Sequence, residues 1–357
     1  MRLFVDARKL RHGGIGRYIE NLLIGLFRQN IELTLVCSSN EDTQSLRKLS
    51  DTKITTYLVD TAPQYSIREY FFFALKYKKF IDSCDWYISP HYTLPFFISC
   101  KKLVVIHDCI HVTYPDTIFH KLIGKILIRS AINRANKVLT VSEASKSSIV
   151  NEFGVKDSGI HVIHNSLLSI LSGELPMHRS DYISKPKLLF IGADRPHKRI
   201  GIFLEFLNLL RDSNFEFQAT LVTELKEDSE MFIKLNHLSS CTNVYSKISN
   251  QELLGVYKNS DFLVSTSAEE GFCLPLLEGM SMGLSVIAPL RPFSEELLSD
   301  AGWFFESGSA ADLFRVFVNA LSDLELMKRK IQTGMRRAEE YSLASNTELF
   351  LEYLKAA

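Results

Sequence analysis

At 357 residues the chain is long enough for about two domains, and its 46% hydrophobic and 23% charged residues supply ample material for two cores. The N-terminus reaches a charge too early for a secretory signal, and no apolar run approaches the ~18 residues of a membrane span, so we expect a cytoplasmic protein. The six scattered cysteines form no Cys-x-x-Cys pair and are expected to be reduced thiols, and no basic run or recognition motif indicates nucleic acid.

The formal net charge is zero, but the two halves of the chain differ. Residues 1–180 carry 23 Lys and Arg against 16 Asp and Glu, a net charge of +7, and residues 181–357 carry −7. One interpretation is that the first half meets something anionic, such as a phospholipid surface or a lipid-linked phosphate. The other is that two solvated surfaces of opposite charge attract one another.

Short apolar runs recur along the chain, each followed by a helical pattern, and these runs predict strands. In the first half we expect strands at Leu3–Val5, Glu32–Cys37, Trp86–Ser89, Leu103–Ile106, Lys137–Val141 and Ile160–Ile163. In the second half we expect them at Lys187–Ile191, Ala219–Val222, Thr242–Tyr245, Phe262–Ser265 and Ser285–Ala288. Strands that are nearly all apolar and alternate with helices indicate parallel sheets buried on both faces. The predicted fold class is therefore α/β, with two doubly wound, Rossmann-like domains.

Domain boundaries follow from where this alternation stops. The stretch from Asn165 to Pro186 contains Ser, Gly and Pro and has little periodicity, which indicates a linker. We predict an N-terminal domain at 1–166, the linker at 167–186 and a C-terminal domain at 187–340. Ala310–Arg337 and Asn346–Ala357 read as terminal helices, and the last segment, 341–357, is expected to pack back on the N-terminal domain.

One segment of the first half, Arg68 to Phe80, interleaves aromatic with basic residues. Such a stretch is typical of a helix that lies on a membrane surface. It is equally typical of a core helix with a basic outer face, and both interpretations stay open at this stage.

The richest chemistry follows the strand at Phe262–Ser265. Glu270 and Gly271 lie in a loop, and a helix opens with Pro275 in its first turn, where a missing N–H costs least. A helix start presents backbone N–H groups and a positive dipole end, which suit a phosphate. Glu278 falls about one turn into that helix, and carboxylates are good acceptors for vicinal hydroxyls of sugars and ribose.

Several motifs together resemble the family 4 retaining glycosyltransferases of the GT-B fold, over nearly the whole chain. Glu270-Gly-Phe-Cys-Leu-Pro-Leu-Leu-Glu278 resembles the E-x7-E signature of that family. The other resemblances are Asp6 with Gly13-Gly-Ile-Gly-Arg-Tyr18, His107-Asp108, Thr140-Val-Ser-Glu-Ala-Ser145, Val162-Ile-His-Asn165 and Phe190-Ile-Gly-Ala-Asp-Arg-Pro-His-Lys198. The resemblance implies two Rossmann-like domains that face a cleft.

The resemblance also implies roles for individual residues at the donor. Glu270 would contact hydroxyls of the donor sugar and Glu278 the nucleotide ribose, while Lys198, helped by Arg195, would neutralise the leaving diphosphate. The loop after the first strand of the second domain, at Gly192, and the segment from Gly271 through Phe272, Cys273 and Leu274 would bind phosphate.

From the N-terminal domain, the resemblance implies that His107 touches the donor sugar at the reacting centre. Gly14 and Gly16 would let the first loop approach the donor phosphates and the acceptor.

Three positions depart from the family pattern. Family members often have Gly where this chain has Cys273, many have Arg where it has Ala193, and Gly is usual where it has Ser166. We therefore expect an altered backbone at Cys273, and Arg195 as the substitute for the missing arginine.

The implied reaction transfers a hexose from a nucleotide sugar to a saccharide acceptor with retention of configuration. The motifs look most like the mannosyltransferase branch, which indicates GDP-mannose as donor and a polyprenyl-diphosphate-linked acceptor in O-antigen or other surface polysaccharide synthesis. The chain contains no Asp-x-Asp, which disfavours a metal-dependent diphosphate site, and no other cofactor is expected.

Alternatives remain open at this stage. The donor could instead be UDP-glucose, UDP-N-acetylglucosamine or dTDP-rhamnose, and a sugar-nucleotide epimerase or a two-domain binding protein would share the architecture. An epimerase would turn over without an acceptor, and contact with the inner face of the plasma membrane is a further expectation.

Overall fold

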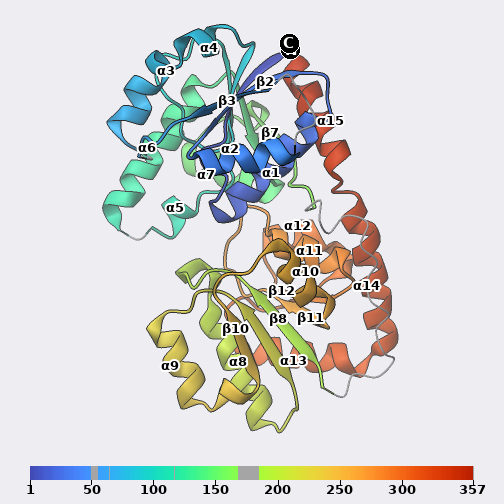
Figure 1. Ribbon diagram of the computed structural model, residues 1–357. Helices are drawn as coiled ribbons and strands as arrows, with labels where there is room; N and C mark the ends of the chain where they lie inside the picture. Colours follow the sequence, from blue (N-terminus) through green and yellow to red (C-terminus); the bar gives the residue numbers. More distant parts are fainter. Residues whose placement is uncertain (50–54, 64, 116, 168–184, 357) are drawn as a thin grey trace. The chain divides into compact units, whose positions relative to one another are not determined.

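The computed structural model describes residues 1–49, 55–63, 65–115, 117–167 and 185–356, which form two α/β units (Figure 1). Unit 1 comprises Met1–Ser166 together with Leu343–Ala357, and unit 2 comprises Leu167–Ser342. Most of the predicted linker at 167–186 lies outside the described residues.

The sheet of unit 1 contains seven parallel strands in the order β3-β2-β1-β4-β5-β6-β7. Their bounds are β1 Arg2–Asp6, β2 Glu32–Cys37, β3 Thr55–Val59, β4 Trp86–Ser89, β5 Lys101–Val105, β6 Lys137–Thr140 and β7 Ile160–Val162. The chain starts in the centre of this sheet and winds outward in both directions. This order places the carboxyl ends of β1, β4 and β5 side by side, where ligands of doubly wound sheets bind.

The helices of unit 1 are α1 Gly13–Phe27, α2 Asn40–Leu49, η1 Arg68–Phe72, α3 Phe73–Lys76, α4 Lys78–Asp82, α5 Ile110–Thr113, α6 Ile118–Arg134, α7 Glu143–Phe153, η2 Asp157–Gly159 and α15 Leu343–Lys355. The last of them, α15, packs closely against α1. A Cβ atom on Gly25 of α1 would lie only 2.0 Å from the hydroxyl oxygen of Thr347 of α15, so this contact requires glycine.

Unit 2 has a six-stranded parallel sheet in the order β10-β9-β8-β11-β12-β13. The strands are β8 Lys187–Ile191, β9 Gln218–Val222, β10 Thr242–Tyr245, β11 Phe262–Val264, β12 Ser285–Pro289 and β13 Trp303–Phe305. The helices are η3 Pro196–Lys198, α8 Ile200–Asp212, α9 Glu227–Leu235, η4 Leu238–Ser240, α10 Asn250–Lys258, α11 Leu274–Ser281, α12 Pro292–Leu298, η5 Ser299–Ala301, α13 Ala310–Ser322 and α14 Leu324–Glu339. The predicted α/β class with two doubly wound parallel sheets is confirmed, and the architecture is GT-B.

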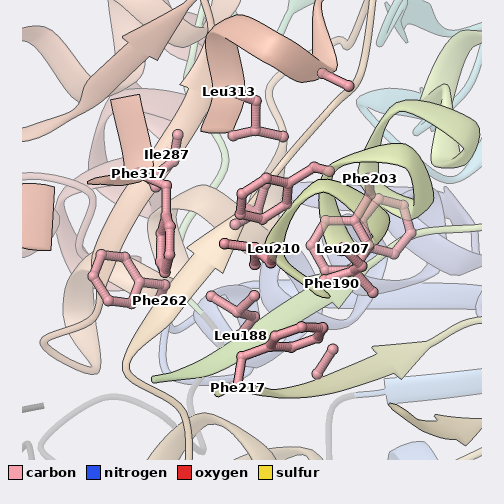
Figure 2. Close-up of a cluster of buried hydrophobic side chains, with 14 of the residues drawn as sticks. Leu188, Phe190, Phe203, Leu207, Leu210, Phe217, Phe262, Ile287, Leu313 and Phe317 are labelled. Carbon is pink, nitrogen blue, oxygen red and sulfur yellow. The ribbon is translucent and has the colours of Figure 1, made fainter. Parts of the chain in front are cut away.

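The core of unit 2 is rich in phenylalanine, and it fixes the strands whose ends carry the site. Figure 2 shows Phe203 of α8 beside Phe190 of β8, with ring centroids 5.2 Å apart. Phe317 of α13 packs edge-on against Phe262 of β11 at 5.0 Å. Because aromatic pairs add to the energy of burial, they help to anchor α8 on β8 and α13 on β11.

Two sequence expectations for secondary structure are wrong. The predicted helix over Ala310–Arg337 is two helices, since Asp323 leaves the helical conformation with φ −121° and ψ 79°. Its side chain caps α14 by accepting a hydrogen bond from the N–H of Leu326 at 2.9 Å. The strands β3 and β13 were not expected. Among the described residues, no helix is both long and apolar enough to cross a membrane.

Candidate functional site

Lys198 and Glu270 lie together at the carboxyl ends of two neighbouring strands. Lys198 ends the short helix η3 after β8, and Glu270 lies in the loop after β11. The ammonium of Lys198 forms an ion pair with the carboxylate of Glu270, which also accepts a hydrogen bond from the hydroxyl of Ser267 at 2.6 Å. The family resemblance assigns Lys198 to the diphosphate of the donor and Glu270 to its sugar, whereas in this structure the two side chains form an ion pair with each other.

The two loops that carry this pair are joined by backbone contacts. The N–H of Ala268 donates to the carbonyl of His197 at 2.6 Å. The hydroxyl of Thr266 lies 2.8 Å from the carbonyl oxygen of Lys198 and 3.0 Å from that of Arg199. These bonds hold the loop of Lys198 against the loop of Glu270, and they explain why the polar side chain of Thr266 is buried.

A third support comes from the end of β12. The guanidinium of Arg291 donates through Nε to the carbonyl of Ala268 at 2.9 Å. Neither Arg291 nor Ser267 and Thr266 was predicted as part of the site. The signal available in the sequence was their position directly after apolar strands, where doubly wound sheets bind ligands.

Glu278 lies inside the protein, on the first helical turn beyond the loop. It is 0% exposed and accepts a hydrogen bond from the hydroxyl of Tyr257, which is itself 0% exposed. The hydrogen bond from Tyr257 of α10 therefore fixes the orientation of the Glu278 carboxylate. Sequence reasoning missed Tyr257, because an aromatic residue in a helix reads as core.

Cys273 immediately precedes α11 and has the left-handed backbone conformation, with φ 67° and ψ 67°. That conformation costs most residues other than glycine roughly 1 kcal/mol, so Cys273 occupies a strained turn that glycine would adopt freely. Burial, followed by the charge of Glu270, raises the pKa of its thiol, which makes the residue an unreactive thiol.

The strain at Cys273 can be measured by comparing two truncations. Both Cys273→Ala and Cys273→Gly remove the buried thiol, but only glycine adopts φ 67° without a steric penalty. We expect Cys273→Gly to be more stable than Cys273→Ala by about 1 kcal/mol in urea unfolding. Equal stability of the two variants, or a more stable alanine variant, would contradict the strained turn.

The remaining donor-side residues have different surroundings. Arg195 is exposed and immediately precedes η3, three residues before Lys198. A Cβ atom on Gly192 would make only ordinary contacts, 3.5 Å from Lys198 and 3.6 Å from Phe190, so packing does not require glycine there. Phe272 and Leu274 are buried on either side of Cys273, and the ring of Phe272 packs edge-on against Tyr341 at 5.5 Å.

In unit 1, the two glycines that were predicted in a loop lie in the first turn of α1, and they differ sharply. A Cβ atom on Gly16 would lie 2.1 Å from the carbonyl oxygen of Leu10, so the close approach of the turn after β1 requires glycine. A Cβ atom on Gly14 would meet nothing within 4 Å. The packing of the protein therefore leaves open space beside the backbone at Gly14 but not at Gly16.

His107 is half-buried just beyond β5. Its Nε2 lies 2.8 Å from the carbonyl oxygen of Pro90, and its ring packs edge-on against Tyr18 of α1 at 4.8 Å. Burial lowers the pKa of His107, although the Pro90 carbonyl and Asp108 act in the opposite direction. The ring is thus neutral at pH 7, with Nε2–H donating to Pro90 and Nδ1 left as the acceptor nitrogen.

A buried charge cluster, defined by Asp6, Arg8 and Glu69, lies at the carboxyl end of β1. Arg8 donates to Asp6 at 2.8 Å and 2.6 Å and to Glu69 at 2.8 Å, and all three side chains are at most 5% exposed. Burial alone would raise the pKa of Asp6, but the guanidinium of Arg8 brings it far below its ordinary value. Beside this cluster, burial and the charge of Lys9 lower the pKa of His91 to about 4.

Other candidate chemistry is sparse. In the part of the chain that the structure describes, no three His, Cys, Asp or Glu side chains gather in a way that could hold a metal ion. All six cysteines are free thiols.

Two family models match the chain. Glycosyltransferase Family 4 matches residues 12–167, and the model for glycosyl transferases group 1 matches residues 180–337. The second match spans β8 to α14 and includes Lys198, Glu270 and Glu278.

Curated relatives are similar at modest identity. The O-antigen chain mannosyltransferase RfbU of Salmonella typhimurium is 27% identical over 60% of this chain and 59% of that protein. An MMP alpha-(1->4)-mannosyltransferase of Mycolicibacterium hassiacum is 26% identical over 57% of this chain and 50% of that protein. The matched region thus spans about half to three fifths of the length of these two relatives.

Solved structures share the fold over the whole chain. Anabaena HepE in complex with UDP and glucose has a TM-score of 0.79 at 15% identity, with 100% of both chains covered. Sucrose-phosphate synthase from Thermosynechococcus elongatus has a TM-score of 0.78 at 14% identity, also with 100% of both chains covered. At these identities the likeness concerns the fold alone.

Proposed function

Because the chain belongs to glycosyltransferase family 4, with a group 1 glycosyl transferase domain in its second half, we propose that it transfers a hexose from a nucleotide sugar to a saccharide acceptor. The observation that carries the proposal is the Lys198–Glu270 pair, a few residues before the start of α11. In one loop cluster a cation and a helix start suit the diphosphate, and the carboxylates of Glu270 and Glu278 suit the hydroxyls of the sugar and the ribose.

The ion pair gives the donor a specific way to bind. Lys198 is only partly exposed, and its ammonium is neutralised by Glu270. A diphosphate carries more charge than one carboxylate and would draw Lys198 away from Glu270. Glu270, still held by Ser267 at 2.6 Å, then turns its acceptor oxygens to the hydroxyls of the sugar. Donor binding therefore separates the pair and gives each partner its role.

Transfer breaks the bond between the anomeric carbon and a diphosphate oxygen, so negative charge grows on the leaving phosphate. Lys198, with Arg195 at the outer edge of the loop and the N–H groups at the start of α11, stabilises that charge without a metal ion. The acceptor proton leaves with the departing phosphate on the same face of the sugar, so configuration is retained and no protein nucleophile is required.

The family resemblance also assigns roles to residues of unit 1. His107 is neutral and offers Nδ1 as an acceptor for a hydroxyl of the donor sugar. Gly14, where a side chain would meet nothing, leaves backbone accessible to phosphate or acceptor, whereas Gly16 only shapes the turn. Tyr257 holds the carboxylate of Glu278 for the nucleotide ribose.

Within this proposal the donor is GDP-mannose and the acceptor is a saccharide linked to polyprenyl diphosphate at the inner face of the membrane. The similarity to the O-antigen chain mannosyltransferase RfbU and to a second O-antigen chain mannosyltransferase from Escherichia coli, 22% identical over 72% of this chain, supports mannose and a surface polysaccharide.

A panel of nucleotide sugars tests the donor assignment. GDP-mannose at a hundred times its dissociation constant should stabilise the fold by about 2.7 kcal/mol and raise the melting midpoint by several degrees. UDP-glucose, UDP-N-acetylglucosamine and dTDP-rhamnose serve as matched competitors, and a larger shift with one of them would replace mannose as the donor. No shift with any of these sugars would contradict the proposed function. Isomerisation of the nucleotide sugar without an acceptor would favour an epimerase, whereas a transferase releases nucleoside diphosphate only when an acceptor is present.

A further inference from the structure

Unit 1 exposes large apolar side chains on two helical segments. On the first segment Ile67, Phe71, Phe72 and Leu75 are exposed, and on α6 Ile118, Phe119, Leu122 and Ile126 are exposed. Ile67 is 73% exposed and Ile118 is 87% exposed, so these side chains do not rest on a neighbouring element. Single exposed apolar residues are ordinary on a protein surface, but eight on two segments are not.

The core does not account for these side chains. Along η1 and α3 the inward positions are occupied by Tyr70, Phe73 and Ala74, which are buried, and Phe73 and Ala74 belong to the unit 1 core. Along α6 the inward positions include Ile128 and Ala131. Both segments therefore carry a second apolar face in addition to the one that anchors them.

The two segments are linked through the loop between β4 and β5. Arg134 ends α6, about two turns beyond Ile126. The guanidinium of Arg134 lies 4.2 Å over the ring of Phe96, and Phe96 contacts Phe71 of η1 with ring centroids 4.9 Å apart.

Phe97, in the same loop, strengthens this link. It is 66% exposed and has φ 63°, a conformation that disfavours a bulky residue. Its ring lies 6.3 Å from that of Phe96. A strained backbone that presents an aromatic ring to solvent is more typical of a binding surface than of a structural loop.

The exposed charges on these segments all have one sign. From Ile67 to Phe80 the exposed charged residues are Arg68, Lys76, Lys78 and Lys79, and from Ile118 to Arg134 they are Lys121 and Arg129. Lys76 and Lys78 form ion pairs with Asp60 and Asp82 at 2.8 Å and 2.6 Å. The acidic residue within the first segment, Glu69, points inward and is paired with Arg8. The second segment contains no acidic residue at all.

We propose that these nine apolar side chains, Phe97 included, form a docking surface for an anionic lipid bilayer, referred to below as the bilayer-docking surface. Phenyl and aliphatic groups enter the boundary between head groups and acyl chains, and the interleaved ammonium and guanidinium groups stay at the level of the lipid phosphates. The inference deepens the proposed function and rests on it for the lipid-linked acceptor, which unit 1 would meet at this surface.

Vesicle flotation tests the surface separately from transfer. The full chain should float with phosphatidylglycerol-containing phosphatidylcholine vesicles, and much less with phosphatidylcholine alone or at high salt. The triple variant Phe119→Ser, Leu122→Ser, Ile126→Ser changes only exposed side chains and should reduce partitioning at least tenfold. Lys79→Glu with Lys121→Glu should abolish the preference for anionic vesicles.

A matched control replaces exposed apolar residues of unit 2, Met231→Ser with Leu235→Ser on α9, and should bind vesicles like the unaltered chain. Both serine variants should keep the thermal shift with GDP-mannose. The thermal shift reports donor binding and flotation reports bilayer binding, so failure of one proposal can be told apart from failure of the other. The inference is overturned if the unaltered chain stays unbound with anionic vesicles, or if the triple variant floats equally well. It is also overturned if light scattering without vesicles finds a dimer that the triple variant abolishes, since a second copy would then cover the surface.

Discussion

Replacing Lys198 with alanine is expected to lower the turnover number of the proposed transfer by roughly two to three orders of magnitude, while the donor dissociation constant changes by less than about tenfold. The reason is that charge accumulates on the diphosphate only as the glycosidic bond to it breaks. An ammonium beside that oxygen is therefore worth more in the transition state than in the complex with intact donor. Single-turnover kinetics and calorimetric donor binding on the same preparation measure the two effects.

The ion pair with Glu270 makes a second explanation possible, in which Lys198 acts only by orienting that carboxylate. A double-mutant cycle separates the two. If Lys198 only orients Glu270, then Lys198→Ala should cost nothing further in a Glu270→Gln background. A leaving-group role requires a large additional loss there, and Lys198→Arg should retain more activity than Lys198→Ala because the charge is kept.

Arg195→Ala is the matched control for this experiment. Arg195 is exposed at the edge of the same loop, where water screens its charge, so its removal is expected to cost about tenfold or less. Near-normal turnover in Lys198→Ala would eliminate the leaving-group role and would move the search for the cation to Arg195.

The central strands of both sheets were predictable, whereas two of the four edge strands, β3 and β13, were not. The central strands β2, β4 and β8 have the predicted bounds, because a central strand is a short apolar run between helical patterns. β3 and β13 lie at the edges of their sheets and are partly exposed. An edge strand such as Thr55–Val59 has no need to be apolar on both faces, so it lacks the signal on which the prediction depended.

The break at Asp323 has a different cause. A Ser-Asp pair inside an amphipathic pattern is a helix-start signal, and it stands in the sequence at Ser322–Asp323. The apolar periodicity continues on both sides of this pair, and it therefore predicted one uninterrupted helix in spite of the helix-start signal.

The composition of the donor site could be read from the sequence, but its pairings could not. Lys198 and Glu270 are 72 residues apart, and their contact follows from β8 and β11 being neighbours. The strand order of a parallel sheet is not encoded in any local pattern. The same holds for Tyr257 and Glu278, since a hydroxyl that meets a carboxylate inside the protein leaves no trace in the spacing of either residue.

Arg8→Met is expected to destabilise unit 1 by about 3–5 kcal/mol at pH 7, measured as the free energy of unfolding in urea. Methionine fills much of the volume of arginine but leaves the carboxylates of Asp6 and Glu69 buried without their shared cation. Arg2→Met is the matched control, because the Arg2–Asp85 pair is half exposed and 4.0 Å long and should contribute less than ~1 kcal/mol.

The pH dependence of the free energy of unfolding distinguishes the loss of the Arg8 charge from the loss of its packing. In the unaltered protein the pKa of Asp6 is depressed, so its contribution to stability is full above the unfolded pKa of about 3.9 and is lost as pH falls. Without Arg8 the desolvation of Asp6 dominates and its pKa rises, so the folded variant takes up a proton before the unfolded chain does. The difference between the two proteins should therefore shrink as the pH is lowered from 7 toward 4. A difference that stays constant across this range would mean that Arg8 acts through its packing against the ring of Phe73, 4.5 Å away, and not through its charge.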